Sequence, residues 1–379
     1  MADKKNILII FEGSHIAFSP SIAQMHKVLS SEFNISVLAQ DPAEFSQNTK
    51  LPFYLETYPL NSVKGRYFYK GIFALLLMIN SEARLFNRYF KRQYLEYFFR
   101  FLRIKKLLAT NKYQAIICVD LKNLFLINTL LKKRSYFLSL ELCYAEHVLP
   151  AIDTALVEAV IIQSQVRFDY LFKDKKINTF IIPNAPVFDA AVVKASRSGL
   201  VYTGTAWKPF GFDYCLRYLL QAPQEKLTVL GTLKGDLLKR NEDYQSLLKR
   251  QLFIHNEYIK DEEVVDFLSV FEIGFCFYNF DVKWINNFNY QSAPSGKIFK
   301  YIAAGVPVIC NSIVGFNFVD EFKCGVRIDQ FDADTIAAAV KRIRNNYDEY
   351  VQGALNAAAH FSFDKAVAPF LTYTQQHIH

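Results

Sequence analysis

The stretch SAPSGKIFKYIAAGVPVIC, Ser292–Cys310, decides the fold because it predicts a complete helix-to-strand unit. Gly305 closes the predicted helix, Pro307 prevents its continuation, and Val308–Cys310 has the apolar composition of a buried strand. A helix followed at once by a buried strand is typical of an α/β protein. Three apolar residues recur at the spacing of one helix face and predict packing on a core: Ile298, Tyr301 and Ile302.

The start of this helix combines several features that suit an anion. Ser295 is placed to cap the helix through its hydroxyl, and Gly296 has no side chain that would block close approach. Lys297 adds a positive charge of the kind that binds phosphate. The first turn of a helix also exposes unpaired N–H groups at the positive end of its dipole. Two interpretations stay open: an ordinary helix with a surface lysine, or an anion site, which the Pro-Ser-Gly-Lys order favours.

Apolar strands alternate with helical segments along the rest of the chain. A first series has strands at 6–11, 34–39, 115–119, 136–140, 159–163 and 179–182, with a helix near 124–132. The pattern breaks around Pro183-Asn184-Ala185-Pro186, and a second series has strands at 200–202, 227–230, 252–255, 272–277 and 308–310. This order predicts two doubly wound, Rossmann-like α/β domains with parallel sheets. We expect them to face each other across a cleft at the carboxyl edges of their strands.

Length and composition favour a globular protein of the cytoplasm. A chain of 379 residues predicts two domains, and 51% hydrophobic residues exclude a disordered one. The six cysteines contain no Cys-x-x-Cys pair, which argues against zinc or a disulfide framework and suits the reducing cytosol. No signal peptide precedes the first strand, and the longest apolar run, Gly71–Asn80, is too short to span a bilayer.

The segment Lys64–Lys112 carries much of the positive charge. It holds twelve Lys and Arg residues against two acids, Glu82 and Glu96, with aromatic residues interleaved. Basic, aromatic helices fit an anionic membrane surface, where rings lie among the headgroups and cations meet lipid phosphate. The other interpretation is a pair of core helices with basic polar faces. Nucleic acid is a weaker candidate, because no recognition motif is present.

The C-terminal half resembles retaining glycosyltransferases of the GT-B fold, closest in style to glycosyltransferase family 4. The family segment reads Pro-Ser-x-Lys-[Ile/Leu]-Phe-Glu-Tyr-[Met/Leu]-Ala-x-Gly-x-Pro-Val-Ile, and Pro294–Ile309 follows it closely. Shorter similarities occur in the expected order at 181–184, 201–204, 252–259 and 275–278. The resemblance covers residues 180 to 345, whereas the N-terminal half matches only in fold pattern and in its first glycine loop.

The resemblance implies the domains and the donor site. It implies an acceptor-binding domain at 1–186, a nucleotide-sugar domain at 187–360, and a C-terminal helix at 361–379 that packs back on the first domain. No metal or cofactor is implied beyond the nucleotide-sugar substrate; Asp332-Ala-Asp334 is read as a helix cap. The implied donor-binding residues are Gly13, Ser14, Gly204, Thr205, Lys208, His255, Ser295, Gly296, Lys297, Ile298, Lys300 and Tyr301.

Three positions depart from the family pattern. Lys300 stands where the family has a glutamate that holds the donor ribose, and a lysine cannot accept those hydrogen bonds. Thr205 replaces an arginine, although Lys208 lies nearby in the sequence. Leu140 stands where many relatives carry a histidine, and Glu141 follows it. These departures imply either a different donor pose or impaired catalysis.

Residues of the first domain are candidates for catalysis and acceptor binding. His15, in a loop after the first strand, and Glu141 are the catalytic candidates, although a solvated loop histidine is an equal alternative. Asp120 ends a strand and is placed to bind acceptor hydroxyls or only to cap the next helix. Glu146 and His147 follow the fifth strand and are further acceptor candidates.

We therefore expect transfer of a sugar from a nucleotide donor to an acceptor hydroxyl, with retention. The basic segment adds a glycan or lipid-linked acceptor at the inner face of the plasma membrane, in cell-surface glycan synthesis, with no nucleic-acid partner. Two alternatives remain: a catalytically impaired relative that binds a nucleotide sugar or a partner, and a GT-B epimerase. The long match at Pro294–Ile309 disfavours the epimerase.

Overall fold

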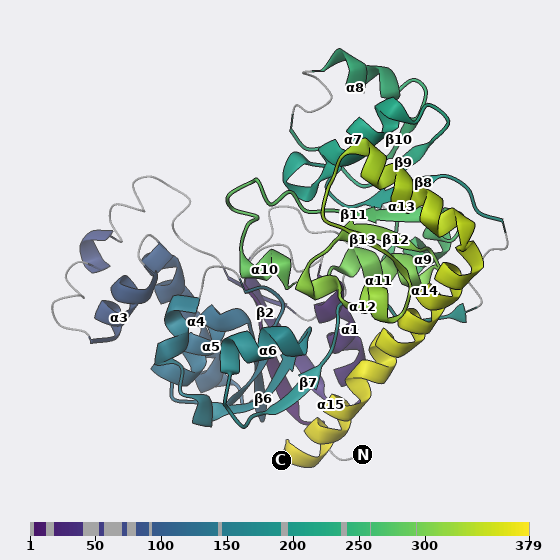
Figure 1. The fold of residues 1–379 in the computed structure, drawn as a ribbon. Helices are drawn as coiled ribbons and strands as arrows, with labels where there is room; N and C mark the ends of the chain where they lie inside the picture. Colours follow the sequence, from purple (N-terminus) through teal and green to yellow (C-terminus); the bar gives the residue numbers. More distant parts are fainter. Residues whose placement is uncertain are drawn as a thin grey trace. The chain divides into compact units, whose positions relative to one another are not determined.

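The structure is a computed structural model of the whole chain, shown in Figure 1. It describes residues 4–12, 19–40, 53–56, 70–73, 81–90, 93–142, 146–190, 196–235, 241–257, 259–292 and 294–378. These residues form two compact units. Unit 1 comprises Met1–Ile181 with Val367–His379, and unit 2 comprises Ile182–Ala366. The division falls five residues before the one expected at 186.

Unit 1 is built on a seven-stranded parallel sheet with the order β3-β2-β1-β4-β5-β6-β7. The order reverses between β1 and β4, so the crevice where such sheets bind ligands lies between the carboxyl ends of these two strands. The strands are β1 Asn6–Ile10, β2 Asn34–Gln40, β3 Phe53–Glu56, β4 Ala115–Val119, β5 Ser135–Ser139, β6 Val157–Ile162 and β7 Asn178–Ile181. The helices are α1 Pro20–Leu29, α3 Ser81–Phe90, α4 Tyr94–Thr110, α5 Asp120–Leu124 and α6 Gln165–Phe172.

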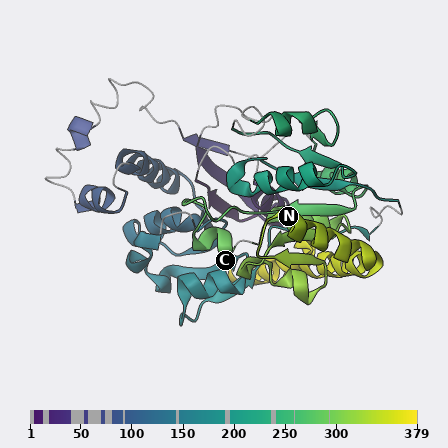
Figure 2. The same ribbon diagram turned by 45° about the horizontal axis from the view of Figure 1, so that its top comes forward.

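Unit 2 is built on a six-stranded parallel sheet with the order β10-β9-β8-β11-β12-β13, which reverses between β8 and β11. Helices cover both of its faces, as Figures 1 and 2 show. The strands are β8 Leu200–Thr203, β9 Leu227–Leu230, β10 Leu252–His255, β11 Ile273–Cys276, β12 Val308–Asn311 and β13 Gly325–Ile328. The helices are α7 Phe212–Gln221, α8 Glu242–Leu247, α9 Asp261–Leu268, α10 Phe288–Gln291, α11 Gly296–Ala303, α12 Phe318–Glu321, α13 Ala333–Asn345 and α14 Tyr347–Phe361.

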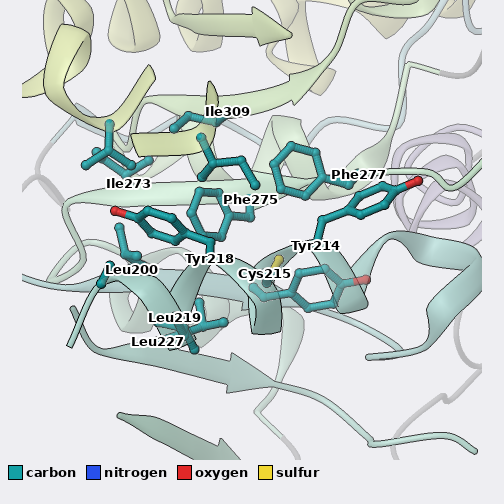
Figure 3. Close-up of a cluster of buried hydrophobic side chains, with 14 of the residues drawn as sticks. Leu200, Tyr214, Cys215, Tyr218, Leu219, Leu227, Ile273, Phe275, Phe277 and Ile309 are labelled. Carbon is teal, nitrogen blue, oxygen red and sulfur yellow. The ribbon is translucent and has the colours of Figure 1, made fainter. Parts of the chain in front are cut away.

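Alternate residues of the unit 2 strands belong to two separate hydrophobic clusters, one on each face of the sheet. Leu200 and Ile309 face α7 and α13, whereas Val201 and Cys310 face α9, α11 and α14. Figure 3 shows the first cluster, in which Phe275 and Phe277 of the β11 segment lie beside Tyr214 and Tyr218 of α7. Both faces are apolar because a parallel sheet is covered on both sides. This explains why these strands read as continuous apolar runs.

The last helix, α15 (Phe363–His377), belongs to unit 1 from Val367 onward. The Tyr373 hydroxyl donates to the Glu158 carbonyl and accepts from Asn178 Nδ2 at 3.0 Å. The Phe370 ring packs edge-on against Phe180, with centroids 5.4 Å apart. These contacts attach the C-terminal helix to strands β6 and β7.

Three elements differ from the sequence expectation. The helix after β4 begins at Asp120, earlier than expected, and continues as a π-helix over Phe125–Leu130. Two edge strands were not expected: β3, which pairs with β2, and β13, which pairs with β12. The expected cap at Asp332 is confirmed, since its carboxylate accepts the Thr335 N–H at 2.8 Å.

Candidate functional site

Helix α11 begins as expected at Gly296, but Ser295 does not cap it. The Ser295 side chain makes no capping hydrogen bond; its buried hydroxyl instead interacts with the Cys276 thiol on β11, where it opposes the rise in the thiol pKa that burial causes. The capping prediction is therefore wrong, because a buried neighbouring strand offers the hydroxyl another partner. A Cβ added at Gly296 would lie 2.9 Å from Asn184 Nδ2, so the missing side chain lets the Pro-Asn segment approach the helix start.

Lys297 lies in an aromatic setting on the first turn of α11. Its Nζ is 4.7 Å from the ring centroid of Tyr202, 5.3 Å from that of Phe210, and 3.4 Å from the Tyr202 hydroxyl. Burial lowers the pKa of the Lys297 ammonium, and the thiols of Cys276 and Cys215 oppose that shift. A lysine expected to be solvated is thus partly desolvated and packed against two rings.

Gly204 makes room for this lysine at the end of β8. Gly204 has φ +90, which favours glycine, and an added Cβ would lie 3.2 Å from Lys297 Cε. Two residues 93 positions apart that the sequence assigned to the donor site are therefore neighbours in space. In the part of the chain that the structure describes, no carboxylate forms an ion pair with Lys297. The ammonium charge is available for an anion.

Lys208 does not share this environment. It is exposed and lines a cavity of about 440 Å³ beside the first turns of α7. The residues around that cavity carry balanced charge and two phenol rings: Lys208, Asp213, Tyr214, Arg217, Tyr244, Asn279, Asp281 and Val282. Lys297 does not line this cavity, so the two lysines expected to share one diphosphate have different surroundings.

Tyr301 and Ile298 lie in the core face of α11. Both side chains are fully buried, and the Tyr301 hydroxyl accepts the Thr203 N–H at 2.7 Å and donates to the Phe275 carbonyl. The Tyr301 ring covers Gly274, where an added Cβ would approach it to 2.8 Å. The resemblance implied that these two side chains contact the donor. Because both are fully buried, they do not present a surface to a ligand. They instead fix α11 against the ends of β8 and β11.

The remaining donor candidates lie around the same edge of the unit 2 sheet. The half-buried His255 ring, at the end of β10, packs on Phe267 with centroids 4.9 Å apart. The Thr205 carbonyl accepts the Tyr202 hydroxyl at 3.2 Å, which holds the loop after β8 beside Lys297. Lys300 is half-buried on α11, one turn after Lys297.

Asp120 forms the centre of the corresponding edge in unit 1. It has φ +62, which is strained for a residue other than glycine, and its Oδ1 accepts the N–H groups of Leu140 and Glu141 at 2.9 Å each. Burial raises the pKa of Asp120 to about 7, and those two N–H groups oppose the shift. The structure thus brings together the predicted residues Asp120 and Glu141 at the switch point of the sheet.

A second carboxylate beside Asp120 was missed by the sequence analysis. Glu12 accepts hydrogen bonds from the Tyr97 hydroxyl and from Lys122 Nζ, the latter at 3.0 Å. Lys122 also lies over the Tyr97 ring, 5.0 Å from its centroid. Glu12 follows β1 and Lys122 follows β4, so both lie at the switch point. Their position after two neighbouring strands was the only sequence signal available.

Of the other acceptor and catalytic candidates, only the side chain of His147 is described, and it does not join this group. The Nε2 atom of His147 lies 2.6 Å from the Tyr89 carbonyl of α3, and its side chain is exposed. Gly13, Ser14 and His15 lie outside the described residues, as does the side chain of Glu146.

The perturbed pKa of Asp120 predicts a pH effect on stability. The pKa of Asp120 in the folded protein lies above its ordinary value of 3.8. The stabilisation that neutral Asp120 gives the folded state is therefore complete below pH 3.8 and is lost as the pH rises through about 7. Asp120→Asn removes this titration while keeping an acceptor for the two N–H groups. We expect the melting temperature of the variant to rise relative to the wild type between pH 4 and pH 8, measured by calorimetry. A constant difference across this range would contradict the assignment.

The aromatic residues of the basic segment form a core. Phe86, Phe90, Tyr97 and Phe101 are buried, and Phe90 stacks on Tyr97 with centroids 4.2 Å apart. Arg100 is also fully buried, and it donates to Asn123 Oδ1 at 2.9 Å. These four buried rings therefore do not lie among lipid headgroups, whereas the expectation stays a prediction for the half-buried rings of Tyr89, Tyr94, Phe98 and Phe99. The alternative of core helices with basic polar faces describes α3 and α4.

Two features are absent from the described residues. No helix among them has the length and apolar character needed to cross a membrane. No three His, Cys, Asp or Glu side chains within that part of the chain are grouped as a metal site would require.

The two units, each a doubly wound parallel sheet with its own switch point, define the GT-B fold, which confirms the fold expected from the sequence. No protein-family model matches the chain, and no curated protein matches it in sequence. Solved structures of this fold do match, at 10–14% identity, which shows shared architecture.

Three of these structures illustrate the similarity. Sucrose-phosphate synthase from Thermosynechococcus elongatus has a TM-score of 0.65 and 14% identity, over 98% of this chain and 99% of that chain. An α,α-trehalose-phosphate synthase (UDP-forming) from Burkholderia xenovorans, in complex with glucose-6-phosphate, has a TM-score of 0.59 and 10% identity, over 98% and 100%. The pneumococcal O-GlcNAc transferase GtfA, in complex with UDP and GlcNAc, has a TM-score of 0.53 and 13% identity, over 74% and 60%.

Proposed function

We propose that the chain is a glycosyltransferase that moves a sugar from a nucleotide-sugar donor to an acceptor hydroxyl. The observation that carries this proposal is the placement of Lys297 against Gly204 at the start of α11, beside the switch point of unit 2. A structure of similar fold supports this proposal, since the pneumococcal GtfA is in complex with UDP. Ser295 stays a prediction as a donor-binding residue.

Lys297 stabilises the leaving diphosphate in this proposal. The ammonium and the N–H groups at the start of α11 meet the negative charge that develops as the bond to the sugar breaks. No divalent metal is needed for that charge. Retention follows if the acceptor hydroxyl attacks from the same face as the leaving oxygen, which then takes its proton. The protein contributes position and charge, and the acid–base chemistry stays with the substrates.

Unit 1 supplies the acceptor site in the same proposal. Asp120, Glu141 and Glu12 present carboxylates at its switch point, and carboxylates accept hydrogen bonds from sugar hydroxyls. Lys122 is neutralised by Glu12 at 3.0 Å. His15 and His147 stay predictions, as do Gly13, Ser14 and Glu146.

A thermal-shift screen tests the proposal directly. The protein is heated with UDP, GDP, ADP and their sugars, with and without a chelator. A ligand that binds only the folded state raises the melting temperature as its concentration exceeds the dissociation constant. We expect one nucleoside diphosphate and its sugar to stabilise the protein whether or not the chelator is present. Failure of every nucleotide sugar to bind would remove the basis of the proposal.

Lys300 gives a test of the donor pose. It lies three residues after Lys297, so it borders nearly the same face of α11, about 5 Å further along the axis. Lys300→Glu places a negative charge there and is expected to weaken nucleotide-sugar binding by roughly tenfold. Calorimetric titration measures the effect, with Lys341→Glu, at an exposed position of α13, as the control. Stronger binding and faster transfer would instead favour an impaired relative whose ribose site lacks its glutamate.

We also propose that unit 1 attaches peripherally to the inner face of the plasma membrane, for a lipid-linked acceptor in cell-surface glycan synthesis. Arg84 and Arg88 of α3 and Lys105 and Lys106 of α4 are exposed, and support this proposal through charge alone. Charge attraction of this kind contributes about 1 kcal/mol per basic residue.

Vesicle binding measures this attachment. We expect co-sedimentation with anionic vesicles to fall steeply with salt and to be lost in Arg84→Glu/Arg88→Glu. Lys132→Glu/Lys133→Glu, exposed elsewhere in unit 1, is the matched control. Equal binding to neutral and anionic vesicles would refute the electrostatic attachment.

A further inference from the structure

Both tryptophans of the chain lie together at the carboxyl edge of the unit 2 sheet. Trp207 follows β8 and Trp284 follows β11, the two neighbouring strands at the switch point. Their ring centroids are 5.5 Å apart, with 38° between the ring planes. The Trp284 side chain is 38% exposed, unlike the aromatic residues of the two core clusters. Large apolar rings are thus presented where an α/β sheet binds its ligands.

The tryptophan pair is connected to Lys297 through one ring. Phe210 lies 6.1 Å from both Trp207 and Trp284, centroid to centroid, and 5.3 Å from Lys297 Nζ. The Phe210 ring therefore lies between the side chain of Lys297 and the tryptophan pair. A ligand held by that ammonium through its phosphates would have its adjoining groups beside these rings.

A second cation lies at the other side of the pair. Lys234 Nζ is 4.7 Å from the Trp207 ring centroid, on the segment that follows β9. Gly235 has φ +84, and an added Cβ would lie 3.2 Å from Trp207 Nε1, so glycine allows this segment to cover the indole. The aromatic group is therefore flanked by Lys234 and Lys297. The rings offer a surface for a planar group, and the two cations attract negative charge. Together they suit a ligand that combines a planar ring with an anionic group.

A nucleoside diphosphate has both properties. Its base offers a π face that stacks on any aromatic side chain, and its phosphates carry the charge that the lysines attract. We propose that Trp207 and Trp284 stack the nucleobase of the donor while Lys297 holds its diphosphate. This inference rests on the proposed function, and it assigns the base to the two tryptophans.

Intrinsic fluorescence tests the stacking, because all tryptophan emission comes from these two residues. The full-length protein is titrated with UDP, GDP and ADP, and with glucose 1-phosphate, which has a sugar and a phosphate but no base. We expect the bound nucleoside diphosphate to quench the emission and glucose 1-phosphate to leave it unchanged. Trp207→Phe and Trp284→Phe each keep a stacking ring and leave one reporter, and both are expected to retain quenching.

Affinity measurements complete the test. By calorimetry, Trp284→Ala is expected to weaken nucleoside diphosphate binding at least about fivefold, and Trp284→Phe is expected to keep most of it. Phe253→Ala, which removes an exposed ring from β10 of the same unit, serves as the control. Quenching by glucose 1-phosphate would assign the rings to the sugar and overturn the proposal. So would calorimetric binding of a nucleotide without quenching.

The two proposals fail in different ways. Lys297→Met removes the charge but keeps the side-chain length, so it is expected to lower nucleotide affinity and to preserve quenching at saturation. If affinity is unchanged in this variant while quenching persists, the stacking is supported and the phosphate role of Lys297 is lost. If none of UDP, GDP and ADP binds the wild type, both proposals are overturned.

Discussion

Lys297→Ala is expected to weaken nucleotide-sugar binding by about 1.5–3 kcal/mol, the range for losing a charged hydrogen bond. The physical reason is that Lys297 carries the ammonium beside the switch point of unit 2, and no described carboxylate pairs with it. Its charge is therefore available to the diphosphate. Isothermal titration with the nucleoside diphosphate identified by thermal shift measures the loss.

Two further variants separate binding from folding. The Lys297 stem packs on Tyr202 and Phe210, so Lys297→Ala removes contacts as well as charge. Lys297→Met keeps the apolar stem and loses only the charge, so it is expected to melt close to the wild type while losing the same affinity. Lys341→Ala, at an exposed position of α13, is the matched control. Wild-type affinity in Lys297→Met would show that the lysine does not hold phosphate.

Arg344→Ala is expected to lower the free energy of unfolding of unit 2 by about 3 kcal/mol, because it leaves a buried carboxylate without its partner. Arg344 Nη1 and Nη2 lie 2.6 and 3.0 Å from the two oxygens of Glu225, whose side chain is only 4% exposed. Nη2 also lies 2.7 Å from Glu272 Oε2. One guanidinium thus joins α13 to the segments before β9 and β11.

Denaturant unfolding measures this effect, with two comparisons. Arg344→Lys keeps the charge but loses the planar fork, so an intermediate loss is expected. Arg342→Ala, exposed on the same helix, is expected to stay within about 0.5 kcal/mol of the wild type. An Arg344→Ala protein as stable as Arg342→Ala would show that Glu225 is solvated in the folded protein.

The sequence predicted those parts of the fold that depend on local pattern. The apolar runs of β8, β11 and β12 appear as expected, because strands covered on both faces must be apolar at every position. The helix α11, with Gly305 after it, also appears as expected, because one apolar face and a glycine stop are local signals.

The chemistry of the candidate sites could be predicted only in part. Lys297 and Gly204 were placed together through the family resemblance, and the structure makes them neighbours. The aromatic surroundings of Lys297 depend on Tyr202 and Phe210, whose contacts with it come from tertiary packing. The same holds for Ser295, whose hydroxyl interacts with the Cys276 thiol on β11. Sequence spacing contains no information on such long-range partners.

Charge counts were misleading where side chains are buried. Arg100 contributes to the positive charge of its segment but lies inside unit 1 with Asn123. Tyr97 belongs to an aromatic series, but its hydroxyl is bonded to Glu12. A basic, aromatic pattern is compatible with either a surface or a core, and only the packing of α3 and α4 decides between them.

The position of α15 has a consequence for synthesis on the ribosome. Unit 1 is discontinuous in sequence: Ile182–Ala366 separates its first part from the residues that begin at Val367. Phe370 and Tyr373, which pack on Tyr136 and Phe180, are therefore translated after every residue of unit 2. Unit 1 therefore cannot complete its packing until every residue of unit 2 has been synthesised.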